Sequence, residues 1–352
     1  MDNKKKYYVM FGSIIGIILF LLICMMLLSS CTKKGSYDKL EKKLIEGAKE
    51  CITNGDVTVA EGQYATVTSD QLITAGYIKS LDKYKNDNCT GSVTIMNNGG
   101  VYNYIPYVSC SNYTTVSLKD RIIEDNLTTT KDGLYYANGE YIFKGVKPNN
   151  YVQFDDQKWL IMKIDANGNI KMIRINPSKN SVVWDSKYNE DTKYRSGEND
   201  FESSSMNEVL KARYKDYSDS AKKHIIPTDI CIGKRTGDNT AIGINIDCSE
   251  KITGQYIGLI TPSEYALASY DKDCNDILSG SCSNYNYFYK NIRESWTANA
   301  MSDTTYQVIL YTGSFRRIYA NESHVFNEVI TINGNEKFIK GDGSEENPYV
   351  IK

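Results

Sequence analysis

The feature that most constrains this chain is one long apolar segment close to its start. Residues 7–28 are predominantly apolar, and Lys4, Lys5 and Lys6 precede them. At a rise of about 1.5 Å per residue, a helix of this length crosses the hydrocarbon core of a bilayer. Lys and Arg accumulate on the cytoplasmic side of such helices. We therefore expect a single-pass plasma-membrane protein with its N-terminus inside and residues 31–352 extracellular.

The end of this segment allows a second interpretation. Leu28-Ser29-Ser30-Cys31 has the order of a bacterial lipobox, in which the cysteine becomes lipidated and the preceding signal is removed. A cleaved secretory signal has an apolar region of about 7–15 residues, and the longer run here favours a retained anchor. Cys31 stays a candidate lipidation site, and both alternatives place the remaining chain on the outer face of the membrane.

Composition and charge agree with an exported globular chain. The formal net charge is -2, so we expect no nucleic-acid partner, because such proteins carry a marked basic surface. The chain has 28 Tyr against 9 Phe. Tyr suits exposed β-surfaces and binding faces, because its apolar ring carries a polar hydroxyl group. A length of 352 residues allows two domains beyond the anchor.

The nine cysteines indicate an oxidising compartment. Six of the seven that follow Cys31 fall into local pairs, whose short loops favour disulfide bonds of about 3 kcal/mol each in the chain-entropy model. Cys51 is left over: it could pair with Cys31, link two chains, or stay free. No CxxC motif and only two histidines occur, which disfavours structural zinc. The predicted bridges are Cys89–Cys110, Cys231–Cys248 and Cys274–Cys282.

Residues 36–115 are predicted to contain two helices and a hairpin. The stretch Tyr37–Ile52 places Leu40, Leu44 and Ala48 on one stripe with a period near 3.6 residues. A capping box at Thr68–Gln71 predicts a second, short helix. The hairpin is expected from strand-like residues at 93–96 and 101–108, joined by a turn at 97–100.

This order of elements resembles a known family. The apolar helix, the amphipathic helix, the phrase SDQLITAGYIKSL and the hairpin GSVTIMNNGGVYNYIPYVSC are similar to type IV pilin-like proteins of Gram-positive bacteria. The resemblance covers about a quarter of the chain and implies a pilin-like module over residues 36–115. Pilins begin with Gly before Phe-Thr-Leu-x-Glu, whereas this chain has no acidic residue between Asp2 and Asp38. We therefore expect an anchored relative rather than a polymerising pilus subunit.

The rest of the chain is interpreted as a connector over 116–140 and a β-rich mixed domain over 141–352. A capping box at Ser205–Glu208 predicts one helix, and a second at Thr261–Glu264, with Pro262 at N1, predicts another. The predicted strands are Tyr151–Phe154, Trp159–Ile164, Ile170–Ile175, Tyr256–Ile260, Tyr306–Tyr311, Phe315–Tyr319 and Val329–Ile332.

This second domain also resembles a family. The phrases QKWLIMKID, IGLITPSEYALAS, SWTAN and GDGSEENPYVI are similar to a domain repeated on surface proteins of Gram-positive gut bacteria. The pattern of helix, disulfide loop and Trp-containing strand resembles C-type-lectin-like and formylglycine-enzyme-like folds. The expected fold class is therefore α+β: a membrane helix, a pilin-like helix-plus-hairpin module, and a larger β-rich domain. The reactive cysteine pair of the formylglycine enzymes has no clear match, because these cysteines have local partners.

The residues that could take part in catalysis or metal binding have simpler structural explanations. His224 and His324 lack a neighbouring nucleophile or metal-site spacing, which favours surface or loop positions. Asp271–Asp276 mimics the start of a calcium loop but lacks its glycine and its final glutamate, so a disulfide-closed turn is favoured. The three tryptophans are expected in the core. We therefore predict no catalytic residue, no cofactor and no metal site.

These features favour a non-catalytic cell-surface protein that serves adhesion or ligand recognition. The expected partners are the membrane, through residues 7–28, and a glycan or protein ligand, through residues 141–352. One alternative is an extracellular enzyme or accessory protein acting on envelope or host glycans. Another is a structural partner of a pilus or secretion assembly. Convergent carboxylates in a cleft of residues 141–352 would favour the enzyme, whereas a flat surface of Tyr, Trp and Asn would favour binding.

Overall fold

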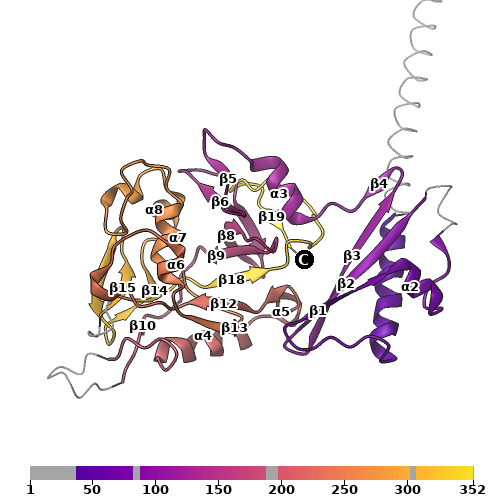
Figure 1. The fold of residues 1–352 in the computed structure, drawn as a ribbon, viewed down its shortest axis with the longest axis horizontal. Helices are drawn as coiled ribbons and strands as arrows, with labels where there is room; N and C mark the ends of the chain where they lie inside the picture. Colours follow the sequence, from indigo (N-terminus) through magenta and orange to yellow (C-terminus); the bar gives the residue numbers. More distant parts are fainter. Residues whose placement is uncertain (1–36, 82–87, 188–196, 302–306, 352) are drawn as a thin grey trace, which may run out of the picture. The chain divides into compact units, whose positions relative to one another are not determined.

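The computed structural model describes residues 37–81, 88–187, 197–301 and 307–351. These residues form a mixed α+β chain with a β-rich body (Figure 1). No helix within these ranges is long and apolar enough to cross a membrane. Residues 7–28 and Cys31, on which the anchor and lipidation predictions depend, lie outside the described residues.

The contacts divide the chain into two compact units. The described part of unit 1 covers residues 37–58, 65–95 and 104–115, without 82–87. Unit 2 covers residues 59–64 and 96–103, together with the chain from residue 116 onward. The tip of the hairpin, residues 96–103, thus packs with residues of unit 2 rather than with the helices of unit 1.

Unit 1 contains the two predicted helices. The first covers residues 37–53, and its stripe of Leu40, Leu44 and Ala48 is completely buried, as the 3.6-residue period predicts. The second is α2 (Ser69–Thr74). Its capping box is present: the Thr68 side chain accepts from the Gln71 amide, and the Gln71 side chain accepts from the Thr68 amide.

The four-stranded sheet of the hairpin has the order β1-β2-β3-β4. Gly99 and Gly100 form the loop between its two long strands, with φ of +62° and +83°. Positive φ at both central residues matches the twist of a tight hairpin and is easily adopted by glycine. The first strand of this sheet was not predicted, because most of its residues are exposed and show no clear alternation of polar and apolar residues. The strands are β1 (Tyr64–Thr68), β2 (Thr90–Asn98), β3 (Val101–Cys110) and β4 (Tyr113–Thr114).

Unit 2 is built on an eight-stranded sheet with the main path β11-β18-β9-β8-β6-β5, and β7 pairs with both β8 and β19. The strands of this sheet are β5 (Gly133–Ala137), β6 (Glu140–Lys144), β7 (Tyr151–Phe154), β8 (Gln157–Ile164), β9 (Ile170–Arg174), β11 (Ile225–Ile226), β18 (Val329–Ile332) and β19 (Tyr349–Val350).

Smaller sheets and short helices complete unit 2. Three strands form the sheet β14-β15-β16, and two further pairs are β10-β17 and β12-β13. These strands are β10 (Val182–Val183), β12 (Thr228–Cys231), β13 (Lys251–Gln255), β14 (Ser295–Ala300), β15 (Gln307–Tyr311), β16 (Phe315–Tyr319) and β17 (Ser323–His324). The helices are α3 (Leu118–Asn126), α4 (Ser205–Lys215), α5 (Asp219–Lys222), α6 (Ile244–Asp247), α7 (Pro262–Leu267) and α8 (Tyr287–Asn291), with 3-10 turns η2 (Thr236–Asp238) and η3 (Gly280–Ser283).

Strand β8 lies at the centre of the core. Trp159, Leu160, Ile161, Met162 and Ile164 are at most 3% exposed, so both faces of the strand are covered. A continuous apolar run of this kind is typical of a strand buried on both sides. The three tryptophans of the chain are all fully buried, which confirms their predicted place in the core.

Residues 116–140 differ from the expected connector. Helix α3 buries Leu118 and Ile122, and strand β5 buries Leu134 and pairs with β6 along its whole length. The Asn126 side-chain amide donates to the Tyr349 hydroxyl over 2.9 Å, which ties α3 to β19 beside it (Figure 1). The stretch belongs to unit 2, whose core includes Leu118, Ile122 and Leu134.

Two local details also differ from the sequence prediction. Helix α4 is capped by Ser204, one residue earlier than expected, because the Ser204 hydroxyl accepts from the Asn207 amide. Residues 256–260 form only an isolated bridge, between Gly258 and Val329, and the regular strand lies earlier, at β13. Helix α7 begins as predicted, with a complete capping box between Thr261 and Glu264.

Candidate functional site

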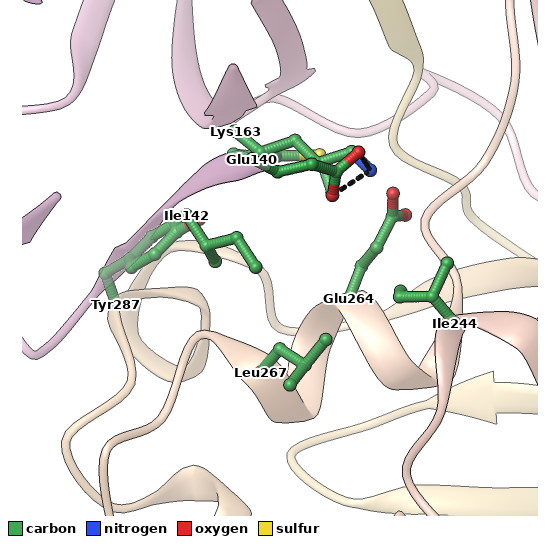
Figure 2. Close-up of a pocket in the computed structure, with 8 residues that line it drawn as sticks. Glu140, Ile142, Lys163, Ile244, Glu264, Leu267 and Tyr287 are labelled. Atoms are coloured by element: carbon green, nitrogen blue, oxygen red, sulfur yellow. Dashed lines mark hydrogen bonds and ion pairs between the residues drawn. The ribbon is translucent and has the colours of Figure 1, made fainter. Parts of the chain in front are cut away.

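Two glutamates converge on a small pocket in unit 2. Glu140 comes from β6 and Glu264 from the first turn of α7, and Figure 2 shows the Glu264 carboxylate directed toward the pair formed by Glu140 and Lys163. The Lys163 ammonium lies 3.1 Å from Glu140, and Lys171 forms an ion pair with Glu264. The cavity volume is about 20 Å³, which holds roughly one water molecule.

The lysines keep the Glu264 carboxylate ionised at neutral pH. Burial alone would raise the pKa of Glu264, but Lys171 and Lys163 lower it below its ordinary value. Burial alone would lower the pKa of Lys163, but Glu264 and Glu140 raise it. General acid catalysis by a carboxyl group needs the opposite, a raised pKa. The two glutamates therefore belong to an ion-pair network. The space beside them holds about one water molecule and is too small for a sugar.

A second arrangement lies on the surface of unit 2, on the loop that follows α7. The rings of Tyr270 and Tyr285 stack with their centroids 4.8 Å apart and an interplanar angle of 19°. The two residues are 37% and 52% exposed, respectively. A stacked pair of aromatic rings that is open to solvent on one loop is a candidate for ligand contact.

The loop that carries this pair is held by covalent and polar bonds. The Cys274–Cys282 disulfide closes its middle. Near its ends, the Ser269 hydroxyl donates to the Asn284 carbonyl over 2.7 Å, and the Asn284 side-chain amide donates to Asp271 over 2.8 Å. These bonds hold the two ends of the loop, which carry Tyr270 and Tyr285, side by side. A ligand that stacks on the rings therefore has to order little of the loop, and the loss of conformational entropy on binding is small.

The backbone of Tyr285 adopts an uncommon conformation. Its φ is +46°, a left-handed region that bulky side chains occupy rarely and at a cost of order 1–3 kcal/mol. The next residue, Asn286, fixes this bend: its side-chain amide donates to the carbonyls of Tyr265 and Cys282, each over 2.8 Å. Backbone strain of this kind is concentrated at functional sites.

Polar groups lie around the Tyr270 ring. The Tyr270 hydroxyl donates to Asp132 over 3.1 Å, and the other Asp132 oxygen accepts from the Lys147 amide over 2.7 Å. Burial and the Asp132 carboxylate raise the pKa of Tyr270, so the hydroxyl stays a donor at neutral pH. The Lys144 ammonium lies 5.7 Å from the ring centre of Tyr135, beside this group. Rings with charged groups at their edges can contact a ligand that is both apolar and polar.

The predicted disulfides are all present: Cys89–Cys110, Cys231–Cys248 and Cys274–Cys282. Among the cysteines that the structure describes, Cys51 is the buried free thiol, 5% exposed. Burial and then Asp56 raise its pKa, which favours the unreactive thiol form.

The two histidines occupy different environments. His224 lies in the turn between α5 and β11, so the predicted loop position is confirmed, but it is only 9% exposed and is not on the surface. Its Nδ1 lies 2.8 Å from Glu336, and its ring packs edge-on against Phe154. His324 is half-buried and lies 3.0 Å from Glu294. Each ring faces a carboxylate rather than a nucleophile.

The calcium-like sequence around Asp271 is used for loop structure. One Asp271 oxygen accepts from the Asp273 amide and the other accepts from Asn284. Within the described residues, no group of three or more His, Cys, Asp or Glu is arranged to hold a metal ion.

The sequence alone does not distinguish Tyr270 and Tyr285 among the 28 tyrosines. The available signal was the disulfide loop itself, because both residues flank the predicted Cys274–Cys282 bridge. No family model, curated protein or solved structure matches this chain significantly.

Proposed function

We propose that this chain is a membrane-anchored cell-surface recognition protein that binds carbohydrate through Tyr270 and Tyr285. The observation that supports this best is the stacked, solvent-exposed pair on a disulfide-closed loop. A pyranose ring presents a face of C–H groups, which packs on an aromatic ring, while its hydroxyls need polar partners at the rim. The exposed rings and the polar groups around them offer both.

The energy available from such contact suits recognition of moderate affinity. Covering about 60–80 Å² of one tyrosine ring contributes roughly 1.5–2 kcal/mol at 25 cal/mol per Å². Weak single contacts of this size become useful when many copies on a cell surface act together. The proposal is therefore an adhesion function, in which avidity adds to a modest affinity at each site.

The carboxylates nearest the rings are engaged in holding the loop. Both oxygens of Asp132 accept hydrogen bonds, as do both oxygens of Asp271. Groups already fixed by the protein can orient a ligand through their remaining lone pairs, but they are poorly placed to exchange protons with it. This supports binding rather than hydrolysis at the tyrosine pair.

The finer fold assignments are part of the same proposal. The helix over 37–53 followed by the β2–β3 hairpin supports a pilin-like module over residues 36–115. The order of α7, the Cys274–Cys282 loop and the Trp296-bearing strand β14 supports a C-type-lectin-like domain over residues 141–352.

A glycan array tests the binding proposal. The complete chain, purified in detergent and clustered through a tag, is expected to bind a defined subset of glycans. Tyr285→Asn should remove that binding, because asparagine tolerates positive φ but provides no ring. Tyr319→Asn removes an equally exposed tyrosine of β16 and should leave the binding pattern unchanged. Equal loss in both variants, or no glycan bound by the wild type, would refute the proposal.

Protease treatment of intact cells tests the topology. Because Lys4–Lys6 precede the apolar run, peptides from residues 37–352 should be released without lysis. Mass spectrometry of the membrane-retained remainder distinguishes an intact N-terminal helix from an acylated Cys31. Peptides that appear only after lysis would contradict the outward orientation.

A further inference from the structure

A larger pocket of unit 2 is separate from the tyrosine pair. Its volume is about 250 Å³, and its lining includes Gln157, Arg174, Lys179, Arg213 and Tyr217. Gln157 begins β8, Arg174 ends β9, and Arg213 lies in the last turn of α4. Ligand pockets for drug-sized molecules measure about 300–1,000 Å³, so this one suits a ligand near the size of a monosaccharide.

A buried carboxylate organises the floor of this pocket. The Glu328 side chain is 1% exposed. One of its oxygens accepts from Arg174 Nη1 at 3.1 Å and from Arg213 Nε and Nη2 at 2.9 and 2.8 Å. The other oxygen accepts from the Tyr217 hydroxyl. Four donors on one buried carboxylate fix both guanidinium groups in the pocket wall.

The floor carries more positive than negative charge. Arg174 and Arg213 are both cationic, whereas Glu328 supplies a single buried negative charge. Arg213 also contacts Asp216 at 2.8 Å, but the Asp216 side chain is 63% exposed and screened by water. At the rim, Lys179 and Asp155 are both exposed and carry opposite charges, so the positive excess is that of the two arginines over Glu328 in the floor. A partly buried excess of positive charge is costly unless an anion approaches it.

Hydrogen-bond donors remain available on the arginines. Arg174 uses Nη1 for Glu328 and Nη2 for Gln157, at 3.1 Å each, while its Nε is buried without a hydrogen-bond partner in the described part of the chain. A guanidinium has five N–H donors. The pocket therefore contains both the charge and the unused donors that a carboxylate would engage.

We propose that this pocket binds a small organic carboxylate, such as an acidic sugar, with Arg174, Arg213 and Lys179 as its recognition groups. Glu328 acts as a positioning residue: it holds the two guanidinium groups and limits how tightly an anion binds. The site is independent of the tyrosine pair, so its failure would leave the carbohydrate proposal untouched.

Calorimetric titration of the complete chain with glucuronate tests this proposal. Binding is expected for glucuronate and not for glucose, which has the same ring but no carboxylate, and a parallel titration with glutamate distinguishes an acidic sugar from an amino-acid carboxylate. Lys179→Gln should weaken glucuronate binding about three- to tenfold. Lys340→Gln, an exposed lysine outside the pocket lining, should not change it. Equal binding of glucose, or identical loss in both variants, would overturn the proposal.

Glu328→Gln gives a second readout that a merely structural role would not produce. Removing the buried negative charge leaves both arginines and raises the positive charge of the floor. Glucuronate should then bind several-fold more tightly, although the variant is less stable. Weaker or unchanged binding by folded Glu328→Gln would contradict the assigned role, and if this variant does not fold, Lys179→Gln against Lys340→Gln decides the proposal.

Discussion

Replacing Asp247 with Ala is expected to lower the free energy of unfolding by about 3–5 kcal/mol, because it leaves a buried arginine without its counter-charge. Arg235 and Asp247 are both completely buried. The Arg235 Nη2 and Nε atoms lie 2.6 and 2.9 Å from the same Asp247 oxygen. A guanidinium in this position cannot reach water.

The pair also connects three segments of unit 2. Arg235 donates to the backbone carbonyls of Asn239 and Ala241, and the second Asp247 oxygen accepts from the Ser263 amide over 2.8 Å. Ser263 lies in the first turn of α7, and Asp247 precedes Cys248 of the Cys231–Cys248 disulfide. Loss of the carboxylate therefore also frees the amide at the start of α7, which adds to the expected cost.

Equilibrium urea unfolding measures this effect, with tryptophan fluorescence as the signal, because all three tryptophans belong to unit 2. Asp229→Ala is the matched control. Asp229 lies 3.9 Å from Lys251, and both side chains are nearly half exposed, so its loss should cost less than about 1 kcal/mol. Similar costs for the two variants would show that Arg235 is not held as described.

Trp184→Ala is expected to cost a comparable 3–5 kcal/mol, the usual range for a large aromatic side chain removed from a core. Trp184 is fully buried and packs edge-on against Phe201, with ring centroids 5.6 Å apart. Its Nε1 donates to the Thr297 carbonyl of β14 over 2.9 Å. The substitution thus removes a large volume and leaves a buried carbonyl without this donor.

Trp184→Phe separates these two contributions. Phenylalanine keeps most of the apolar volume but provides no donor for Thr297, so about half of the loss should remain. The same urea titration, followed by the signal of the other two tryptophans, measures both variants. A Trp184→Ala variant as stable as wild type would mean that the ring does not fill the core of unit 2.

Features set by neighbouring residues were predictable from the sequence. The capping boxes at Thr68 and Thr261 and the three disulfides depend on residues close in the chain, and all of them are present. Strands β7, β16 and β18 have their predicted limits because their apolar and aromatic residues have a high strand propensity.

Features that depend on distant partners were not predictable. Strand β5 has no pattern of its own and is defined by pairing with β6. Glu328 gains its role only because Arg174 and Arg213, more than a hundred residues earlier, reach it in the fold. His224 is buried because Glu336 and Phe154 enclose it. The membrane anchor and the lipidation of Cys31 stay predictions from the sequence.

The most direct test of the central proposal is the affinity of one array-selected glycan for three forms of the complete chain, measured by calorimetry. Tyr285→Phe keeps the ring and should bind within about threefold of wild type. Tyr285→Asn loses the ring without a backbone penalty and should bind at least about tenfold more weakly, or 1.4 kcal/mol. If Tyr285→Asn binds as tightly as wild type, carbohydrate recognition by the Tyr270–Tyr285 pair is contradicted.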